Sequence, residues 1–134
     1  MKYQYKDFNM ELKEKIKRME SVLKEHVERR LQENKSVFAE KNLDLDAGFD
    51  QEGDDPFKPG YRSSVSVGVT DKSSGEMIDF YMIKIWVCER SLFGMPISKP
   101  IPGSKIIGEL LDESVEEVKE ELQDYIEEVL NAGI

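Results

Sequence analysis

The sequence is poor in the residues that build disulfides and metal centres. It contains one cysteine, Cys88, and one histidine, His26. A single cysteine cannot close an internal disulfide, and one cysteine with one histidine cannot make a zinc site of the usual kind. We therefore expect no metal, no cofactor and a reduced thiol at Cys88.

Long hydrophobic runs are also missing. The longest uncharged apolar stretches in the middle of the chain are residues 80–83 and 85–88, far short of the roughly 18–20 residues needed to span a bilayer. The N-terminal residues are charged, and the apolar segment of a signal peptide does not follow them. These absences predict a cytoplasmic protein with no membrane partner.

Positive charge is in short supply. The 134 residues include 19 Lys/Arg and 28 Asp/Glu, which gives a net charge of -9 and a pI near 4.7. This balance argues against binding to nucleic acid or to an anionic membrane. Hydrophobic residues still make up 39% of the chain, enough for a core. The length predicts a single domain over residues 1–134.

The first segment has the apolar spacing of a long amphipathic helix from about Asp7 to about Asn34. Its apolar residues recur at steps of three and four: Phe8, Leu12, Ile16, Met19, Leu23, Val27 and Leu31. Asp7 is the predicted N-cap, and acid–base pairs four residues apart, such as Glu20–Lys24, favour the helix. Such a helix would be about 40 Å long, so we expect part of it to project past the core or to pair with another chain.

Three strands are predicted next. Apolar and polar residues alternate over 43–50 and over 61–70, and the turn residues at 71–76 form a hairpin connection to a third strand over 77–88. The third strand is largely apolar on both faces, so we expect it to be central and covered on both sides. The Pro-rich segment that follows, or another chain, would cover the face that the helices leave open.

That Pro-rich segment spans residues 89–105 and contains three prolines and two glycines, which exclude a regular helix. It also contains apolar residues, among them the candidate partner-binding residues Phe93, Met95 and Ile97. We expect it to fold over the sheet or to serve as a binding loop, with part of it as an edge strand.

The last segment is a strongly acidic helix. Ser114 and Glu117 have the spacing of a capping box, and Gly133 is the expected C-terminal glycine. Residues 112–134 carry nine Asp/Glu and one Lys. The candidate partner-binding carboxylates form a ridge on this helix: Glu116, Glu117, Glu120, Glu121, Asp124, Glu127 and Glu128. The ridge is either a solvated face or a docking surface for a basic partner.

The order of these elements predicts an α+β fold. A long N-terminal helix and an acidic C-terminal helix would pack on one face of an antiparallel meander of three to four strands. The parallel, doubly wound alternative lacks its alternating helices.

Catalytic and metal-binding motifs are weak throughout. His26 has no predicted nucleophile or carboxylate partner, and Cys88 has only Arg90 nearby as a cation, so we predict no catalytic residue, although a Cys88–His26 dyad stays open. The aspartates between Asp44 and Asp55 do not fit a calcium loop, because Phe49 stands where that loop requires glycine. We expect an acidic strand face instead.

The primary functional hypothesis is a non-enzymatic protein-binding module that forms a homodimer. Such a module could be an inhibitor or immunity-like protein that binds its target through the acidic helix. One alternative is a small-molecule-binding domain or enzyme with a pocket near Trp86, Tyr81 and His26. Another is a nucleic-acid mimic, which requires the acidic helix and the Asp44–Asp55 region to form one continuous surface.

Overall fold

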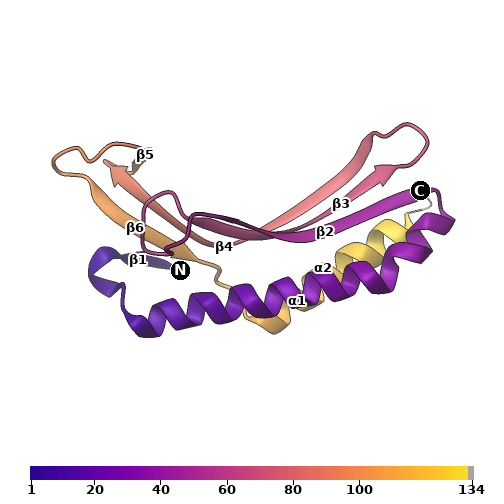
Figure 1. Cartoon of the computed structure of the whole chain (residues 1–134), viewed down its shortest axis with the longest axis horizontal. Helices are drawn as coiled ribbons and strands as arrows, with labels where there is room; N and C mark the ends of the chain where they lie inside the picture. The colour runs from indigo at the N-terminus through magenta and orange to yellow at the C-terminus, as the bar shows by residue number, and fades with distance from the viewer. Residues whose placement is uncertain (133–134) are drawn as a thin grey trace. The chain divides into compact units, whose positions relative to one another are not determined.

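The computed structural model of the chain describes residues 1–132 and confirms the α+β fold (Figure 1). The elements in chain order are β1 (Lys2–Gln4), the 3-10 turn η1 (Tyr5–Asp7), α1 (Met10–Glu40), β2 (Leu43–Glu52), β3 (Arg62–Asp71), β4 (Met77–Leu92), β5 (Met95–Ile97), β6 (Lys105–Leu110) and α2 (Val115–Asn131). The strands form one antiparallel sheet in the order β1-β6-β4-β3-β2, and β5 pairs with β4. The sheet therefore has six strands, two more than the upper limit predicted.

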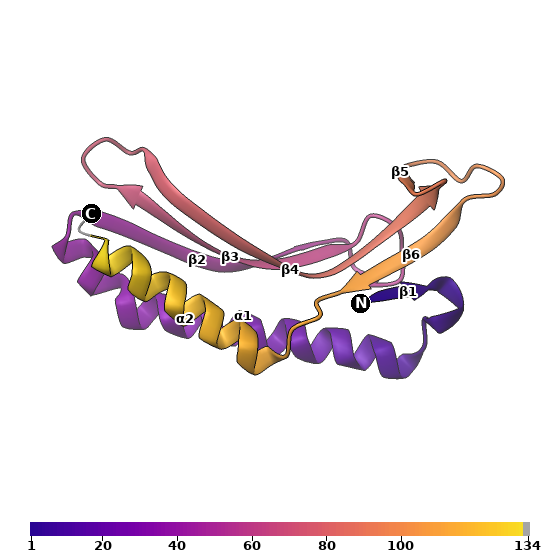
Figure 2. The same cartoon turned by 180° about the vertical axis from the view of Figure 1, so that it is seen from behind.

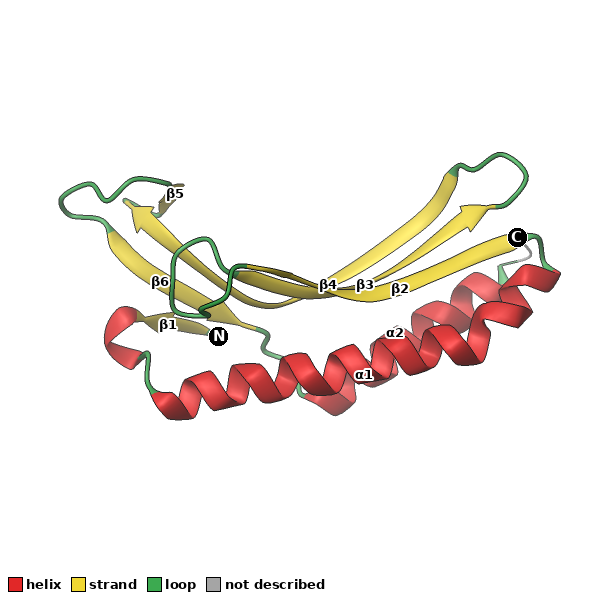
Figure 3. Ribbon diagram, viewed as in Figure 1, coloured by secondary structure: helices red, strands yellow, loops and turns green. Residues whose placement is uncertain are grey.

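The chain forms two compact units, and neither is a continuous stretch of sequence. The first comprises Met1–Ser21, Asp50–Ser64 and Lys84–Asp112. The second comprises Val22–Phe49, Val65–Ile83 and the residues from Glu113 onward. The elements α1, β2, β3 and β4 each contribute one part to each unit. Figure 3 distinguishes the helices, strands and loops of the chain by colour.

The long helix begins and ends later than predicted. Its cap is Asn9, whose side-chain oxygen accepts the N–H of Leu12 at 2.8 Å. The prediction of Asp7 as the cap is wrong, because Asp7 belongs to η1 and its carboxylate accepts the N–H of Gln4 at 3.0 Å. At the other end, Asn34 donates from its side chain to the Arg30 carbonyl at 2.8 Å, so this polar residue is satisfied within the helix rather than ending it.

The core of the first unit is built around Trp86. Its indole N–H donates to the Pro56 carbonyl at 2.7 Å, and its ring lies edge-on to Phe8 and Phe57, which stack on each other at 4.6 Å. Gly108 on β6 faces the same ring, and a Cβ there would lie 2.0 Å from it. The glycine is what allows the backbone of β6 to approach a fully buried indole.

A buried acid also belongs to this unit. The Tyr61 hydroxyl donates to Glu20 Oε2 at 2.6 Å, and both residues are almost fully buried. Lys17 Nζ is 3.9 Å from the same carboxylate group. Glu20 was expected to pair with Lys24 on the helix surface, and the structure instead turns it inward to Tyr61. Burial and this hydrogen bond raise the pKa of Tyr61 well above its ordinary range.

In the second unit, α1 from Val22 and α2 lie side by side on one face of the strands (Figures 1 and 2). The predicted alternation is confirmed, since Leu43, Leu45, Val65, Val67 and Val69 are buried while their neighbours are less so. The buried residues of α2 are Val118, Leu122, Ile126 and Val129. The apolar sides of α1 and α2 and the apolar face of β2 and β3 therefore form the core of the second unit.

Both ends of α2 are satisfied. At its start, Ser114 and Glu117 exchange side-chain-to-backbone hydrogen bonds of 3.2 Å, which confirms the predicted capping box. Near its end, Lys41 Nζ donates to the Leu130 carbonyl at 3.0 Å. The cation that favours a helix C-terminus thus comes from another part of the chain. The predicted role of Gly133 lies outside the described residues.

The face of β4 opposite the helices is only partly covered. Further along the strand, Trp86 and Cys88 are buried. Towards the start of the strand, however, Ile78, Phe80 and Met82 are 39%, 52% and 46% exposed. The Pro-rich segment does not cover them, because its regular part is β5, which pairs with residues Arg90–Leu92 of β4.

No helix among residues 1–132 is long and apolar enough to cross a membrane.

Candidate acidic groove

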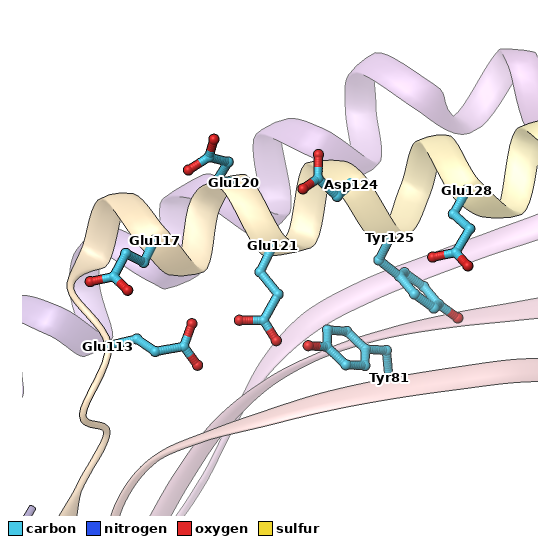
Figure 4. Close-up of a pocket in the computed structure, with 8 residues that line it drawn as sticks. All are labelled: Tyr81, Glu113, Glu117, Glu120, Glu121, Asp124, Tyr125 and Glu128. Atoms are coloured by element: carbon cyan, nitrogen blue, oxygen red, sulfur yellow. The ribbon is translucent and has the colours of Figure 1, made fainter.

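The second unit contains a groove between α2 and β4 with a volume of about 470 Å³ (Figure 4). Six of its lining residues are acidic and two are tyrosines: Glu113, Glu117, Glu120, Glu121, Asp124, Glu128, Tyr81 and Tyr125. None of these lining residues is basic, so the charge of the pocket is of one sign. We call it the acidic groove.

Helical spacing explains which carboxylates line the acidic groove. Glu117, Glu121, Asp124 and Glu128 follow one another at steps of four, three and four, so they share one side of α2. Glu113 continues the same spacing just before the helix begins. Sequence reasoning missed Glu113 because it precedes the cap, although its distance of four residues from Glu117 was a usable signal.

Two residues of the predicted ridge do not line the acidic groove. Glu116 Oε1 lies 3.7 Å from Lys119 Nζ, and Glu127 accepts a hydrogen bond of 2.9 Å from the side-chain amide of Gln123. The predicted ridge is therefore divided between the acidic groove and a second surface of α2 outside it. Five of its seven carboxylates line the groove, and the other two have partners on α2 itself.

The two tyrosines supply an aromatic surface beside the carboxylates. The rings of Tyr81, on β4, and Tyr125, on α2, stack with their centroids 4.9 Å apart and an angle of 20° between their planes. Burial and the neighbouring Asp79 and Glu128 carboxylates raise the pKa of Tyr125 above its ordinary range. The Tyr125 hydroxyl is therefore protonated and uncharged at neutral pH.

Within the described part of the chain, no cation neutralises the groove carboxylates. Among residues 1–132, no lysine or arginine nitrogen lies within 4.0 Å of their oxygens, since the ion pairs of α2 are limited to Lys119 with Glu116. Six like charges on one wall produce a strong negative potential, and a concave surface concentrates it. The arrangement is suited to holding a ligand with several positive charges.

The two candidate catalytic residues, His26 and Cys88, are buried side chains with shifted pKa values. His26 is buried in the second unit, and burial together with the charges of Arg30, Lys119 and Arg29 lowers its pKa, so the ring is neutral at pH 7. In the first unit, burial raises the pKa of the Cys88 thiol to about 11. A nucleophilic cysteine needs the opposite shift.

The aspartates of the Asp44–Asp55 region show no ligand geometry. Asp55 accepts the N–H of Phe57 at 3.0 Å, which is a turn contact. Asp44 and Asp46 are exposed on β2. Within the part of the chain that the structure describes, no group of three or more His, Cys, Asp or Glu side chains is placed to hold a metal ion.

The apolar candidates of the Pro-rich segment lie in the first unit, at a β-hairpin. The register of Leu92 with Met95 leaves Phe93 and Gly94 as a two-residue turn, with φ of 50° and 79°. Phe93 is 95% exposed and Met95 is 69% exposed, whereas Ile97 is half-buried. The expected binding loop is thus a short hairpin that holds an aromatic side chain in solvent, in a backbone conformation that favours glycine or asparagine.

Comparisons with known proteins do not identify a relative. No protein-family model, no curated protein and no solved structure matches this chain. Functional reasoning therefore starts from the geometry and charge of the acidic groove.

Proposed function

We propose that this protein is a non-enzymatic binding module of the cytoplasm whose acidic groove takes a basic segment of another protein. The observation that carries the proposal is the set of six unneutralised carboxylates beside the stacked Tyr81 and Tyr125. Lysine and arginine side chains would form ion pairs with the carboxylates. They would also contact the tyrosine rings, which attract cations through their π faces.

Electrostatic attraction of this kind acts mainly on the rate of association. Complementary charge guides two proteins together and raises the association rate, and added salt reduces the effect. An inhibitor or immunity-like protein that must capture a basic enzyme quickly would use such a surface. The same six carboxylates would also reject acidic partners, which provides specificity.

Octalysine carrying a fluorescent label is a suitable first probe, because it presents positive charge without a fixed structure. The test compares two double variants of α2 that remove the same charge. Glu121→Gln with Asp124→Asn neutralises the acidic groove, whereas Glu116→Gln with Glu127→Gln neutralises carboxylates outside it. We expect the groove variant to lower the association rate about tenfold at low ionic strength and to reduce its dependence on salt.

The control variant should bind octalysine almost as the wild type does. An equal loss of association rate in both double variants would mean that only net charge matters and would contradict the assignment to the groove. Stopped-flow fluorescence at several salt concentrations measures both quantities.

A small organic polycation is a second candidate ligand. The stacked tyrosines give the groove an apolar wall, and its volume of about 470 Å³ falls within the range of small-molecule sites. Spermine tests this possibility in a thermal-shift measurement. A shift in Tm that the groove variant loses and the control variant keeps would favour the small-molecule function.

A further inference from the structure

The strand that forms one wall of the acidic groove has an unpaired edge. On one side β4 pairs with β3. On the other side β6 pairs only with residues Trp86–Ser91 of β4, and the last bond runs from the Leu111 N–H to the Ile85 carbonyl at 2.9 Å. In the described chain, no strand therefore pairs with Met77–Ile83 on the side opposite β3. Unpaired backbone groups of this kind are ready to accept a further strand.

The edge lacks most of the features that protect exposed strands. Residues 77–83 contain no proline, and Asp79 is their only charged residue. Lysines, prolines and very short strands are the usual means of preventing edge-to-edge pairing. Seven residues at about 3.3 Å each give an open edge of about 23 Å, which is long enough for a peptide to pair.

The two faces of this edge differ in chemistry. On the face away from the helices, Ile78, Phe80 and Met82 are exposed. Gly68 of β3 lies beside Phe80 on that face and leaves the ring open, since a Cβ at Gly68 would be 3.7 Å from it. On the helix side, Tyr81 faces the acidic groove (Figure 4). Side chains of an added strand would therefore meet an apolar surface on one face and carboxylates on the other.

We propose that the edge of β4 at Met77–Ile83 binds an extended segment of a basic protein by strand addition, with apolar and basic side chains alternating along that segment. The apolar side chains would cover Ile78, Phe80 and Met82, and the basic ones would enter the acidic groove. This inference rests on the proposed function, and it adds the conformation and the sequence pattern of the partner. Backbone hydrogen bonds supply affinity in such complexes, and alternate side chains supply specificity.

The length of the acidic groove determines how many basic side chains of the added strand it can hold. The groove carboxylates of α2 run from Glu117 to Glu128, which is about 16 Å along a helix. Alternate residues of a strand are about 6.7 Å apart. About three basic side chains at alternate positions therefore match the groove, within a segment of about seven residues.

A second copy of this chain fits the edge less well. Two-fold pairing of β4 with its own copy near Phe80 would place the two Tyr81 residues, and hence the two acidic grooves, next to each other. Each groove brings six carboxylates, and like charges at short range repel. A basic strand removes this repulsion, so we assign the edge to a partner of opposite charge rather than to the homodimer expected from sequence.

The test uses the full chain and a labelled probe peptide that alternates four lysines with three valines. A comparison peptide has the same composition with its lysines in one block and its valines in another. Two further peptides have the alternating sequence with backbone N-methyl groups on either the lysines or the valines. In a strand, alternate residues direct their N–H groups to the same side, so only one methylated peptide blocks pairing with β4.

We expect the alternating peptide to bind at least tenfold more tightly than the block peptide by fluorescence anisotropy. We also expect one methylated peptide to lose at least tenfold in affinity while the other loses little. Equal affinities of all four peptides, with binding still lost in Glu121→Gln with Asp124→Asn, would overturn strand addition and leave the proposed function intact. Binding of no peptide, or binding indifferent to that variant, would overturn both.

A variant of the open face provides an independent measurement. Phe80→Thr removes an exposed ring and keeps a residue that favours strands, so the fold should survive. We expect it to lower the affinity of the alternating peptide severalfold, whereas Ile101→Thr, at an exposed apolar residue of the first unit, should not. Light scattering completes the test, since a stable dimer that refuses the peptide would overturn the proposal.

Discussion

The contact between Gly108 and Trp86 permits a stability prediction with a defined mechanism. In Gly108→Ala the new Cβ would lie 2.0 Å from one ring carbon of Trp86 and 2.4 Å from another. Ordinary contact begins near 3.4 Å, so the ring or the strand has to move by about an ångström or more. The ring is fully buried and its N–H is bonded to the Pro56 carbonyl at 2.7 Å. That hydrogen bond would be strained or lost.

The expected cost combines two effects. Overpacking a core typically costs about 1–3 kcal/mol. An unsatisfied buried hydrogen-bonding group adds about 1–3 kcal/mol. We therefore expect Gly108→Ala to lower the free energy of unfolding by about 2–6 kcal/mol, a loss large enough to unfold a marginal protein.

Trp86 is the only tryptophan in the chain, so its fluorescence reports unfolding in urea directly. Gly48→Ala on β2 is the matched control, because nothing lies within 4 Å of a Cβ built there. Alanine is favoured over glycine within a strand by roughly 0.5–1 kcal/mol, so the control should be neutral or slightly stabilising. Equal urea midpoints for the two variants would refute the close approach of β6 to the indole.

Three further predictions concern single side chains. Phe93→Asn should raise the free energy of unfolding by about 1 kcal/mol, because asparagine tolerates the positive φ of this turn better than phenylalanine does; an unchanged thermal midpoint would contradict this. Tyr61→Phe should cost about 1–3 kcal/mol by leaving the buried Glu20 carboxylate without its donor, as urea denaturation can measure. The lowered pKa of His26 means that the unfolded chain binds this proton more readily, so stability should fall as the pH drops through 6.5 towards the folded pKa. His26→Gln should flatten that fall between pH 7.5 and 5.5, and identical pH profiles would contradict the assignment.

Sequence reasoning succeeded where the pattern is local. The alternation over 43–50 and 61–70 predicted β2 and β3 to within two residues, and the Ser114–Glu117 spacing located the start of α2. In each case the signal is a period or a cap that is complete within one element. Such signals do not depend on what the element packs against.

The missed elements depend on partners that are distant in sequence. β1 has three residues and β6 has six, and each is stabilised by pairing, as in Lys2 with Glu109 and Val87 with Glu109. The inward turn of Glu20 depends on Tyr61, which is 41 residues away. Periodicity in one segment contains no information about such pairs.

The candidate site was predicted in part for the same reason. The carboxylates of α2 are evident in the sequence. Helical spacing, applied strictly, places Glu117, Glu121, Asp124 and Glu128 on a different side of the helix from Glu116 and Glu127. The other wall of the groove is Tyr81 on β4, and the sequence does not say which strand faces α2. The unpaired edge of β4 is likewise a property of the strand order, which the sequence left open.

The discontinuous units have a consequence for the timing of biosynthesis. The first unit needs β6, which ends at Leu110, and the second needs α2, which follows it. Some 70 residues separate the end of α1 from the end of β6, so at about 5–20 residues per second the ribosome makes α1 roughly 4–14 s before either unit is complete. During that interval the apolar side of α1, including Ile16, Leu23 and Val27, lacks part of the core that buries it in the folded protein. We expect the nascent chain to be a client of chaperones, and we expect synonymous codon changes that slow translation between residues 40 and 110 to lower its yield.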